Sequence, residues 1–228
     1  MKRKPQIKAL VFDAYGTLFD VHSVINLCEE FFPGRGAALS QAWRTKQLEY
    51  TWLKSLMKRY QDFEKVTEAA LKYACRSLKL DCTPQARAQL MQAYLYLNTF
   101  PEVKEALAAL SGHKLAILSN GSPRMLKPLV KNNDLAKTFH AVISVDDVKI
   151  YKPDPKVYAL ASKKLKVKKN EIGFVSSNCW DVCGAASFGF RTFWINRGGN
   201  PAEELGFAPA AILTRLTDLI HLVGSLPK

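Results

Sequence analysis

The hydrophobic and polar positions along the chain change their period at two points. A short apolar run from Ile7 to Phe12 has the length of a buried strand and ends abruptly in Asp13. Between residues 20 and 97, apolar side chains recur every three or four positions, which predicts helices. From Glu102 onward, helical stretches alternate with short apolar runs, as in a parallel sheet with crossover helices. The pattern therefore predicts an α/β protein.

The helical block interrupts the alternating pattern, and we expect it to be an insertion. Residues 1–19 and 98–228 are predicted to form a parallel-sheet core domain, and residues 20–97 a helical cap domain. The chain has 228 residues, 48% of them hydrophobic, which is enough for one sizeable core with a smaller inserted domain.

The longest helix of the insertion is predicted from about Ser40 to Tyr60, with Ser40 as its N-cap. Further helices are expected from Asp62 to Leu80 and from Pro84 to Leu97. The long helix has two apolar rows, formed by Trp43, Tyr50, Leu53 and Met57 and by Leu48, Trp52, Leu56 and Tyr60. A helix that is apolar on two faces packs on two sides. One face would cover the core domain, and the other would meet a second subunit in a homodimer.

Polar side chains follow the predicted strands at the points where the strands end. These residues are Asp13, Ser119, Asn120, Ser176, Asn178 and Asp181. Helices are expected to begin after Ser122 and Asp154, each followed by a proline at the first helical position. A single polar residue at a strand end forms a turn. Several at the same edge of one sheet predict a functional site there.

Composition excludes several classes of protein. No apolar run is long enough to span a membrane. The basic start is followed only by a strand-length apolar run that contains Lys8, so we expect no signal peptide. The five cysteines are odd in number and lack metal-finger spacing. Cys179 and Cys183 lie on one helical face without a completing ligand set, which favours small buried thiols. We expect reduced thiols and a cytoplasmic location.

The net charge of +13 has three interpretations: nucleic-acid binding, attraction of small anions, or solubility alone. The densest basic stretch, Lys163 to Lys169, alternates with Leu165 and Val167 and contains no aromatic side chain on which bases would stack. This pattern is typical of a solvated helix end. We therefore predict neither a nucleic-acid partner nor a membrane partner.

Several segments resemble the haloacid dehalogenase superfamily, and most closely its L-2-haloacid dehalogenases. The stretch from Asp13 to Thr17, the Ser119-Asn120 strand end and the Lys152-Pro153-Asp154 segment look like the first three superfamily motifs. The dehalogenase signatures are similar to Phe12 to Ser23, Trp43-Arg44, Gln47 to Trp52, Leu118 to Ser122, Ser176 to Asn178 and Trp180-Asp181. The resemblance covers nearly the whole chain. It implies a Rossmann-like core domain with an inserted cap.

Two departures from the phosphatases of this superfamily are informative. Those enzymes carry a second aspartate two residues after the nucleophile, as the acid for the leaving alcohol, and Tyr15 stands at that position here. They also carry paired carboxylates at the fourth strand end, where this chain has only Asp181. Magnesium prefers an octahedral set of oxygen ligands. We therefore expect no metal and no other cofactor, and a halide leaving group requires neither.

The resemblance implies hydrolytic dehalogenation of L-2-haloalkanoic acids to D-2-hydroxyalkanoic acids. Asp13 would attack C2 and form an ester, the halide would leave, and water would cleave the ester. The partners implied are a small anionic haloacid, water and the halide product. The catalytic residues implied are Asp13, Thr17, Arg44, Lys152, Ser176, Asn178 and Asp181. The substrate-binding residues implied are Ala14, Tyr15, Arg44, Leu48, Phe63, Ser119, Asn120, Tyr158 and Trp180.

Alternative interpretations remain at this stage. Arg44 beside an aromatic row is also typical of a surface arginine whose stem covers apolar residues. Tyr158 and Phe63 also fit ordinary core packing. A phosphatase or another hydrolase of the same superfamily is the second functional hypothesis. A basic nucleic-acid-binding protein on an inactive enzyme fold is the third.

Overall fold

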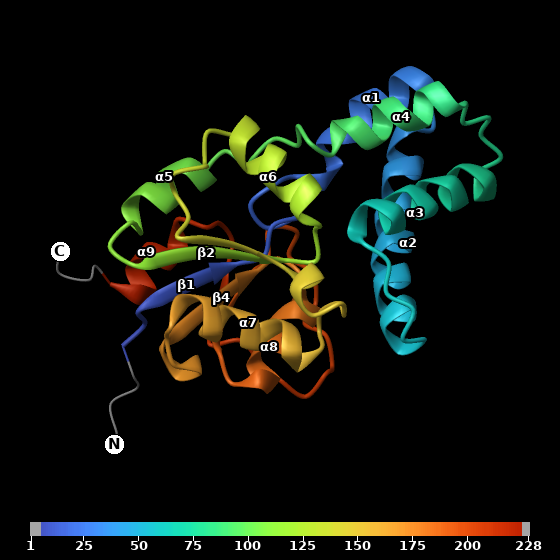
Figure 1. The fold of residues 1–228 in the computed structure, drawn as a ribbon. Coiled ribbons are helices and arrows are strands. Elements are labelled where there is room, and N and C mark those ends of the chain that lie inside the picture. Colours follow the sequence, from blue (N-terminus) through green and yellow to red (C-terminus); the bar gives the residue numbers. More distant parts are fainter. Residues whose placement is uncertain (1–5, 225–228) are drawn as a thin grey trace.

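The computed structural model describes residues 6–224, whose centre is a parallel β-sheet (Figure 1). Its six strands lie in the order β3-β2-β1-β4-β5-β6, and every neighbouring pair is parallel. The strands are β1 (Ala9–Phe12), β2 (Lys114–Ser119), β3 (Ala141–Ser144), β4 (Ile172–Ser176), β5 (Arg191–Ile195) and β6 (Ala211–Leu213). All four residues of β1 are buried, as expected for a central strand covered on both faces.

Helices cover both faces of the sheet. Figure 1 shows α5 (Val103–Ala109) and α6 (Pro123–Asn132) on one face and α7 (Pro155–Leu165) and α8 (Cys179–Phe188) on the other. The last helix, α9 (Asp218–Val223), lies against α5. Short 3-10 helices, η2 (Val145–Asp147) and η3 (Lys169–Glu171), precede α7 and β4. The α/β fold class predicted from the sequence is confirmed.

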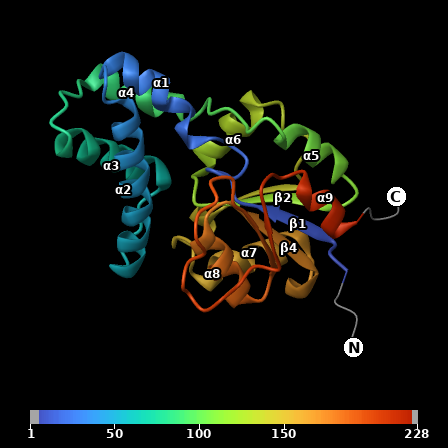
Figure 2. The ribbon, with the colours of Figure 1, turned by 180° about the vertical axis from the view of Figure 1, so that it is seen from behind.

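Four helices of the insertion form a group beside the sheet, on the opposite side from the chain ends (Figures 1 and 2). After η1 (Val21–Val24) these are α1 (Ile25–Phe31), α2 (Gly36–Leu56), α3 (Phe63–Ser77) and α4 (Pro84–Ala93). Apolar residues of α2 and α3 pack with the rest of the core, including Trp43 and Phe63, both fully or almost fully buried. Among residues 6–224, no helix is long and apolar enough to cross a membrane.

The start of α2 corrects one sequence prediction. The helix begins at Gly36, and Ser40 lies inside it, with its hydroxyl 3.1 Å from Nδ1 of His22. The carboxylate of Glu29 accepts hydrogen bonds from the N–H groups of Gly34 and Gly36, and so it satisfies donors at this helix end. A side chain from the preceding helix therefore replaces the local N-cap, and the assignment of Ser40 as N-cap is wrong.

At other helix ends, the structure agrees only in part with the capping residues and boundaries predicted from the sequence. Asp62 and Asp154 cap α3 and α7 by accepting from the N–H groups of Lys65 and Lys156, as predicted for Asp154. Ser122 precedes α6 but makes no capping hydrogen bond with its side chain. Helix α4 ends at Ala93 rather than at the predicted Leu97, because the chain turns there.

Candidate active site

Asp13 lies at the point where β1 ends and the chain turns back. Its N–H donates to the Val175 carbonyl at 2.9 Å and so continues the pairing of β1 with β4. The Ala14 carbonyl then accepts from three N–H groups of the loop, those of Thr17, Leu18 and Phe19. Gly16 has φ +87°, a conformation that L side chains rarely adopt, so a glycine is required at this turn. The loop therefore fixes the direction of the Asp13 side chain.

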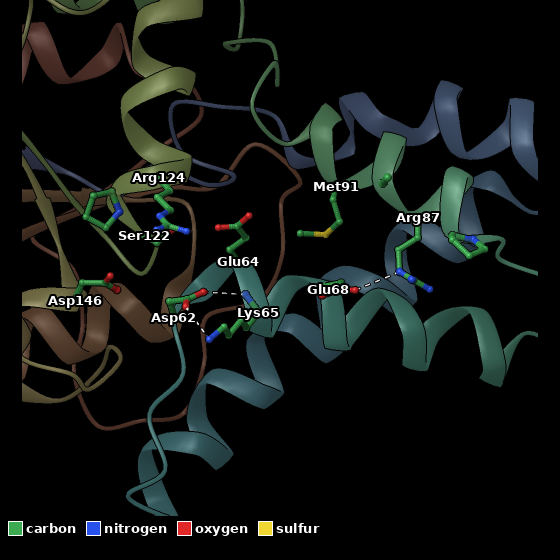
Figure 3. Close-up of a pocket in the computed structure, with 12 residues that line it drawn as sticks. Asp62, Glu64, Lys65, Glu68, Arg87, Met91, Ser122, Arg124 and Asp146 are labelled. Carbon is green, nitrogen blue, oxygen red and sulfur yellow. Dashed lines mark hydrogen bonds and ion pairs between the residues drawn. The ribbon is translucent and has the colours of Figure 1, made fainter.

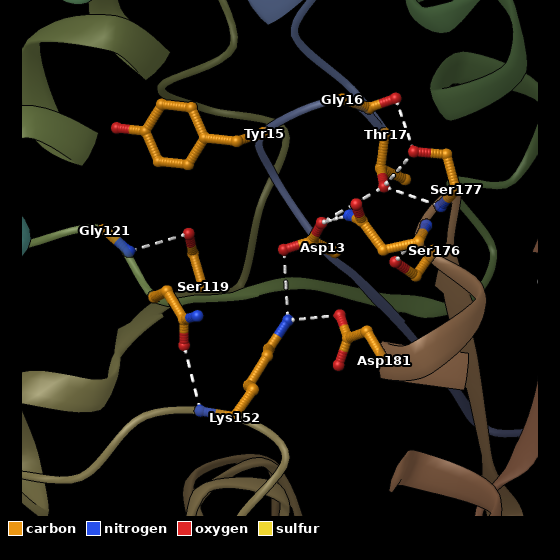
Figure 4. A network of polar contacts seen from close by, with 12 residues as sticks. Asp13, Tyr15, Gly16, Thr17, Ser119, Gly121, Lys152, Ser176, Ser177 and Asp181 are labelled. Atoms are coloured by element: carbon orange, nitrogen blue, oxygen red, sulfur yellow. Dashed lines mark hydrogen bonds and ion pairs between the residues drawn. The ribbon is translucent and has the colours of Figure 1, made fainter. Parts of the chain in front are cut away.

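The Asp13 carboxylate accepts hydrogen bonds from three side chains (Figure 4). Lys152 Nζ lies 3.0 Å from Oδ1. Thr17 Oγ1 and Asn178 Nδ2 donate to Oδ2 at 3.2 Å and 3.0 Å. Asp13 is only 6% exposed, and a carboxylate so buried requires such partners. In Figure 4, Oδ1 faces the side on which Ser119 and Tyr15 lie, and Oδ2 faces Thr17.

Lys152 joins two buried carboxylates. Its Nζ is 3.0 Å from Asp13 and 2.8 Å from Oδ2 of Asp181. Burial by itself lowers the pKa of Lys152, but the two carboxylates outweigh it, and the pKa is raised. Burial raises the pKa of Asp181, whereas Lys152 and the Tyr158 hydroxyl, which donates to Asp181 Oδ1 at 2.8 Å, lower it. Asp13, Lys152 and Asp181 therefore form one ion-pair network, in which the ammonium lies between the two carboxylates.

The same geometry argues against magnesium. A metal bound by Asp13 and Asp181 would lie between their carboxylates, where the Lys152 ammonium is placed. Within residues 6–224, no three His, Cys, Asp or Glu side chains are arranged to hold a metal ion. The residues present therefore do not fit the magnesium site of the superfamily's phosphatases.

Three further strand-end residues brace the loops of this edge. Ser119 Oγ accepts from the Gly121 N–H at 3.0 Å, and Ser176 Oγ accepts from the Asn178 N–H at 3.1 Å. Asn120 Oδ1 accepts from the Lys152 N–H at 3.0 Å. Among the described residues, the Ser119 O–H and the Asn120 NH2 group have no acceptor, so both remain available as donors.

Helix α2 contributes Arg44, which reaches the loop that follows Asp13. Its Nη2 donates to the Tyr15 carbonyl at 3.2 Å, and its Nη1 donates to Gln47 Oε1 at 2.7 Å. Burial lowers the pKa of this guanidinium, and nearby Tyr94 and Asp13 act in the opposite direction. These contacts with core residues differ from those of a surface arginine whose head lies in water.

The rings of Phe63 and Tyr94 pack on Tyr15, in the loop that follows Asp13. The rings of Tyr15 and Phe63 lie 5.3 Å apart, and the buried Tyr15 hydroxyl has no partner among the described residues. Burial raises the pKa of Tyr15 far above its usual value, so this residue stays neutral. Trp180 packs edge-to-face on Trp52 of α2, with ring centroids 5.4 Å apart.

Two hollows lie between the insertion and the core. A cavity of about 480 Å³ is lined by Arg44, Leu48, Asn178 and Arg197, among others, and so includes three predicted site residues. A groove of about 830 Å³ runs between α3, α4 and the start of α6 (Figure 3). Charged residues such as Lys65, Glu68 and Arg87 line that groove, and none of the predicted site residues does.

Two residues of this edge were missed by sequence reasoning. Ser177 donates from its N–H to Thr17 Oγ1 at 2.9 Å and from its hydroxyl to the Gly16 carbonyl. Arg197 follows β5 and donates to the carbonyls of Gly16 and Thr17. Their position at strand ends was the available signal, because these ends lie at the same edge as Asp13.

Comparison with known proteins gives consistent results. A family model described as haloacid dehalogenase-like hydrolase matches residues 7–189. The (S)-2-haloacid dehalogenase of Pseudomonas sp. (strain YL) is 51% identical over 218 residues, which cover 95% of this chain and 94% of that protein. The crystal structure of L-2-haloacid dehalogenase RSc1362 has a TM-score of 0.94 and 48% identity, and covers 96% of this chain and 99% of its own.

A second similar solved structure contains a covalently bound haloacid. L-2-haloacid dehalogenase from Xanthobacter autotrophicus, with chloropropionic acid covalently bound, has a TM-score of 0.91 and 44% identity. The match covers 96% of this chain and 98% of that one.

Proposed function

Because the chain belongs to the haloacid dehalogenase-like hydrolases, we propose that it converts L-2-haloalkanoic acids to D-2-hydroxyalkanoic acids by hydrolysis of the carbon–halogen bond. The observation that carries the proposal is the buried Asp13 carboxylate, held by Lys152, Thr17 and Asn178 with Tyr15 beside it. A relative with chloropropionic acid bound covalently supports a covalent intermediate.

In the first step, Oδ1 of Asp13 attacks C2 of the substrate and the carbon–halogen bond breaks, so the halide leaves with the bonding electron pair. Oδ1 accepts from one donor and faces the side on which Ser119 and Tyr15 lie, whereas Oδ2 is held by Thr17 and Asn178. The attack comes from the side opposite the halogen and inverts C2. A dry, oriented carboxylate is a better nucleophile than a hydrated one.

Cationic and neutral donors bind the charges of the substrate. Arg44 and the free NH2 group of Asn120 stabilise the departing halide, since a guanidinium matches developing negative charge. Ser119, with backbone amides nearby such as that of Ala14, binds the substrate carboxylate. Tyr15, Leu48, Phe63 and Trp180 enclose the alkyl part.

In the second step, water adds to the Asp13 carboxyl carbon and the ester bond breaks at that carbon. Asp181 accepts the proton of the water, in a position set by Lys152 and Tyr158. The oxyanion forms on Oδ2, where Thr17 and Asn178 already donate. Ser176 keeps Asn178 in place. As the bond to Oδ1 breaks, Asp181 returns its proton to that oxygen, which leaves as the hydroxyl of the product. The Asp13 carboxylic acid then releases its proton to solvent, and the carboxylate is regenerated.

We also propose the domain organisation and the assembly. Residues 1–19 and 98–228 form the core domain, and residues 20–97 form a cap that excludes water from Asp13. Leu53 of α2 and Met57 directly after the helix belong to the same apolar row and are 40% and 56% exposed. An apolar helix face of this kind supports a homodimer through the cap, which light scattering at several protein concentrations would test.

Halide release from the two enantiomers of 2-chloropropionate, in EDTA, tests the reaction. We expect chloride from the L form, little from the D form, and a loss of about 10⁴-fold or more in Asp13→Asn. A single turnover in H₂¹⁸O places the label in Asp13, because water attacks the carboxyl carbon, whereas direct attack of water on C2 would label the product. A requirement for magnesium, or turnover of p-nitrophenyl phosphate in place of the haloacid, would contradict the proposal.

A further inference from the structure

Arg197 comes from the segment after β5 but reaches the loop that carries Asp13. Its Nη1 donates to the Gly16 carbonyl at 3.3 Å and its Nη2 to the Thr17 carbonyl at 3.1 Å. We propose that Arg197, held in place by Glu102, is a positioning residue that fixes the Gly16-Thr17 segment and thereby the Asp13 carboxylate. The inference rests on the proposed function, because it concerns the same nucleophile.

The guanidinium of Arg197 is itself restrained from two other directions. Glu102 Oε1 accepts from Nε at 3.1 Å and from Nη2 at 2.8 Å. The ring of Phe100 lies under the guanidinium, with its centroid 3.7 Å from Cζ. The two charged side chains are only 22% and 16% exposed, so water screens this ion pair less than one at the surface. Arg197 is therefore a fixed donor rather than a mobile surface side chain.

The held segment leads directly to the nucleophile. Thr17 Oγ1 donates to Asp13 Oδ2 at 3.2 Å, and the same hydroxyl accepts from the Ser177 N–H at 2.9 Å. Gly16, with its positive φ, restrains the turn less than a residue with a side chain would. The hydrogen bonds from Arg197 and Ser177 to the Gly16 carbonyl supply the missing restraint. A displacement of about 1 Å at a nucleophile lowers rate by about 10²-fold.

Arg197→Met tests this role, with Arg197→Lys as the conservative variant and the exposed Arg215→Met as the matched control. We expect Arg197→Met to lower kcat by about 10- to 100-fold with KM changed by roughly threefold or less, since substrate contacts remain. The lysine keeps one charged donor and should recover part of kcat. Arg215→Met should behave as wild type. All rates are measured well below the melting temperature of each variant, so that only folded protein is compared.

A double-variant cycle with Thr17→Val separates positioning from a general structural role. If Arg197 acts through the Thr17 segment, Arg197→Met lowers kcat far less in the Thr17→Val protein than in wild type. Effects that multiply, or an Arg197→Met kcat within about twofold of wild type, overturn the inference while leaving the proposed function intact. Absence of halide release by the wild-type chain overturns the proposed function, and the inference with it.

Discussion

Removal of the Lys152 ammonium should leave two buried carboxylates without their shared cation. Lys152 is 1% exposed, and Asp13 and Asp181 are 6% and 0% exposed. At about 3 Å and an effective dielectric constant of about 20, two unit charges attract by about 5 kcal/mol. Desolvation offsets part of this attraction, and loss of one partner of a buried pair costs about 3–5 kcal/mol. We therefore expect Lys152→Met to lose about 3–5 kcal/mol of unfolding free energy at pH 8.

The unfolding free energy that Lys152→Met loses should become smaller as the pH falls. Lys152 lowers the pKa of Asp181, so its removal raises that pKa further above the unfolded value. The folded variant then binds more protons than the unfolded chain, and its stability decreases as pH rises through the window between the unfolded and folded pKa values. Each extra bound proton changes the unfolding free energy by up to about 1.4 kcal/mol per pH unit. The difference from wild type should therefore be smaller at pH 5 than at pH 8.

Urea unfolding followed by tryptophan fluorescence at pH 5 and pH 8 measures both effects. Lys104→Met is the matched control, because Lys104 pairs with Asp134 at 3.5 Å on the surface, where the side chains are 55% and 89% exposed. That control should lose less than about 1 kcal/mol. The reasoning is refuted if the two variants lose equal stability, or if the loss in Lys152→Met is the same at both pH values. A variant that folds only at pH 5 agrees with it.

Two further predictions concern Asp181 and its surroundings. Tyr158→Phe removes a donor that lowers the pKa of Asp181, so the acidic limb of kcat should move to higher pH, and an unchanged kcat profile between pH 5 and pH 9 would contradict this. Gly184→Ala places a Cβ about 2.5 Å from the Tyr158 hydroxyl and 2.6 Å from Pro153, so it should lose about 1–3 kcal/mol of stability, which denaturant melts would measure. Adding Tyr158→Phe should restore part of that loss.

The clustering of Asp13 with the other strand-end residues was predictable because it follows from a general rule. Parallel strands place their carboxyl ends at one edge, so an apolar run that ends in Asp13 and another that ends in Ser119 must bring these residues near each other. The cap at Asp154 was predictable for a different reason. The Asp154 carboxylate accepts from the N–H of Lys156, two residues later. A contact over so short a separation can be predicted from the local sequence.

Contacts between distant segments were not predictable in the same way. The start of α2 depends on Glu29, which lies on the preceding helix and replaces the local N-cap. Arg197 reaches Thr17 across the end of β4, because β5 is two strands away from β1 and only a long side chain spans that distance. Neither contact follows from periodicity or from a motif. Each depends on how the chain packs after its elements have formed.

The charges at this edge give the inserted helices a role in the proposed reaction. Asp13, Asp181 and Lys152 together carry a net charge of −1 when both carboxylates are ionised, which disfavours a third carboxylate from a haloacid. Arg44 of α2 adds a compensating positive charge, and it donates to the carbonyl of Tyr15, which lies two residues after Asp13 in the chain. In the proposed dehalogenation the halide leaves without a proton, so a guanidinium would suffice where a phosphatase needs an acid at position 15. In the proposed reaction, anion binding and attack by Asp13 would therefore both require α2 to lie against the core.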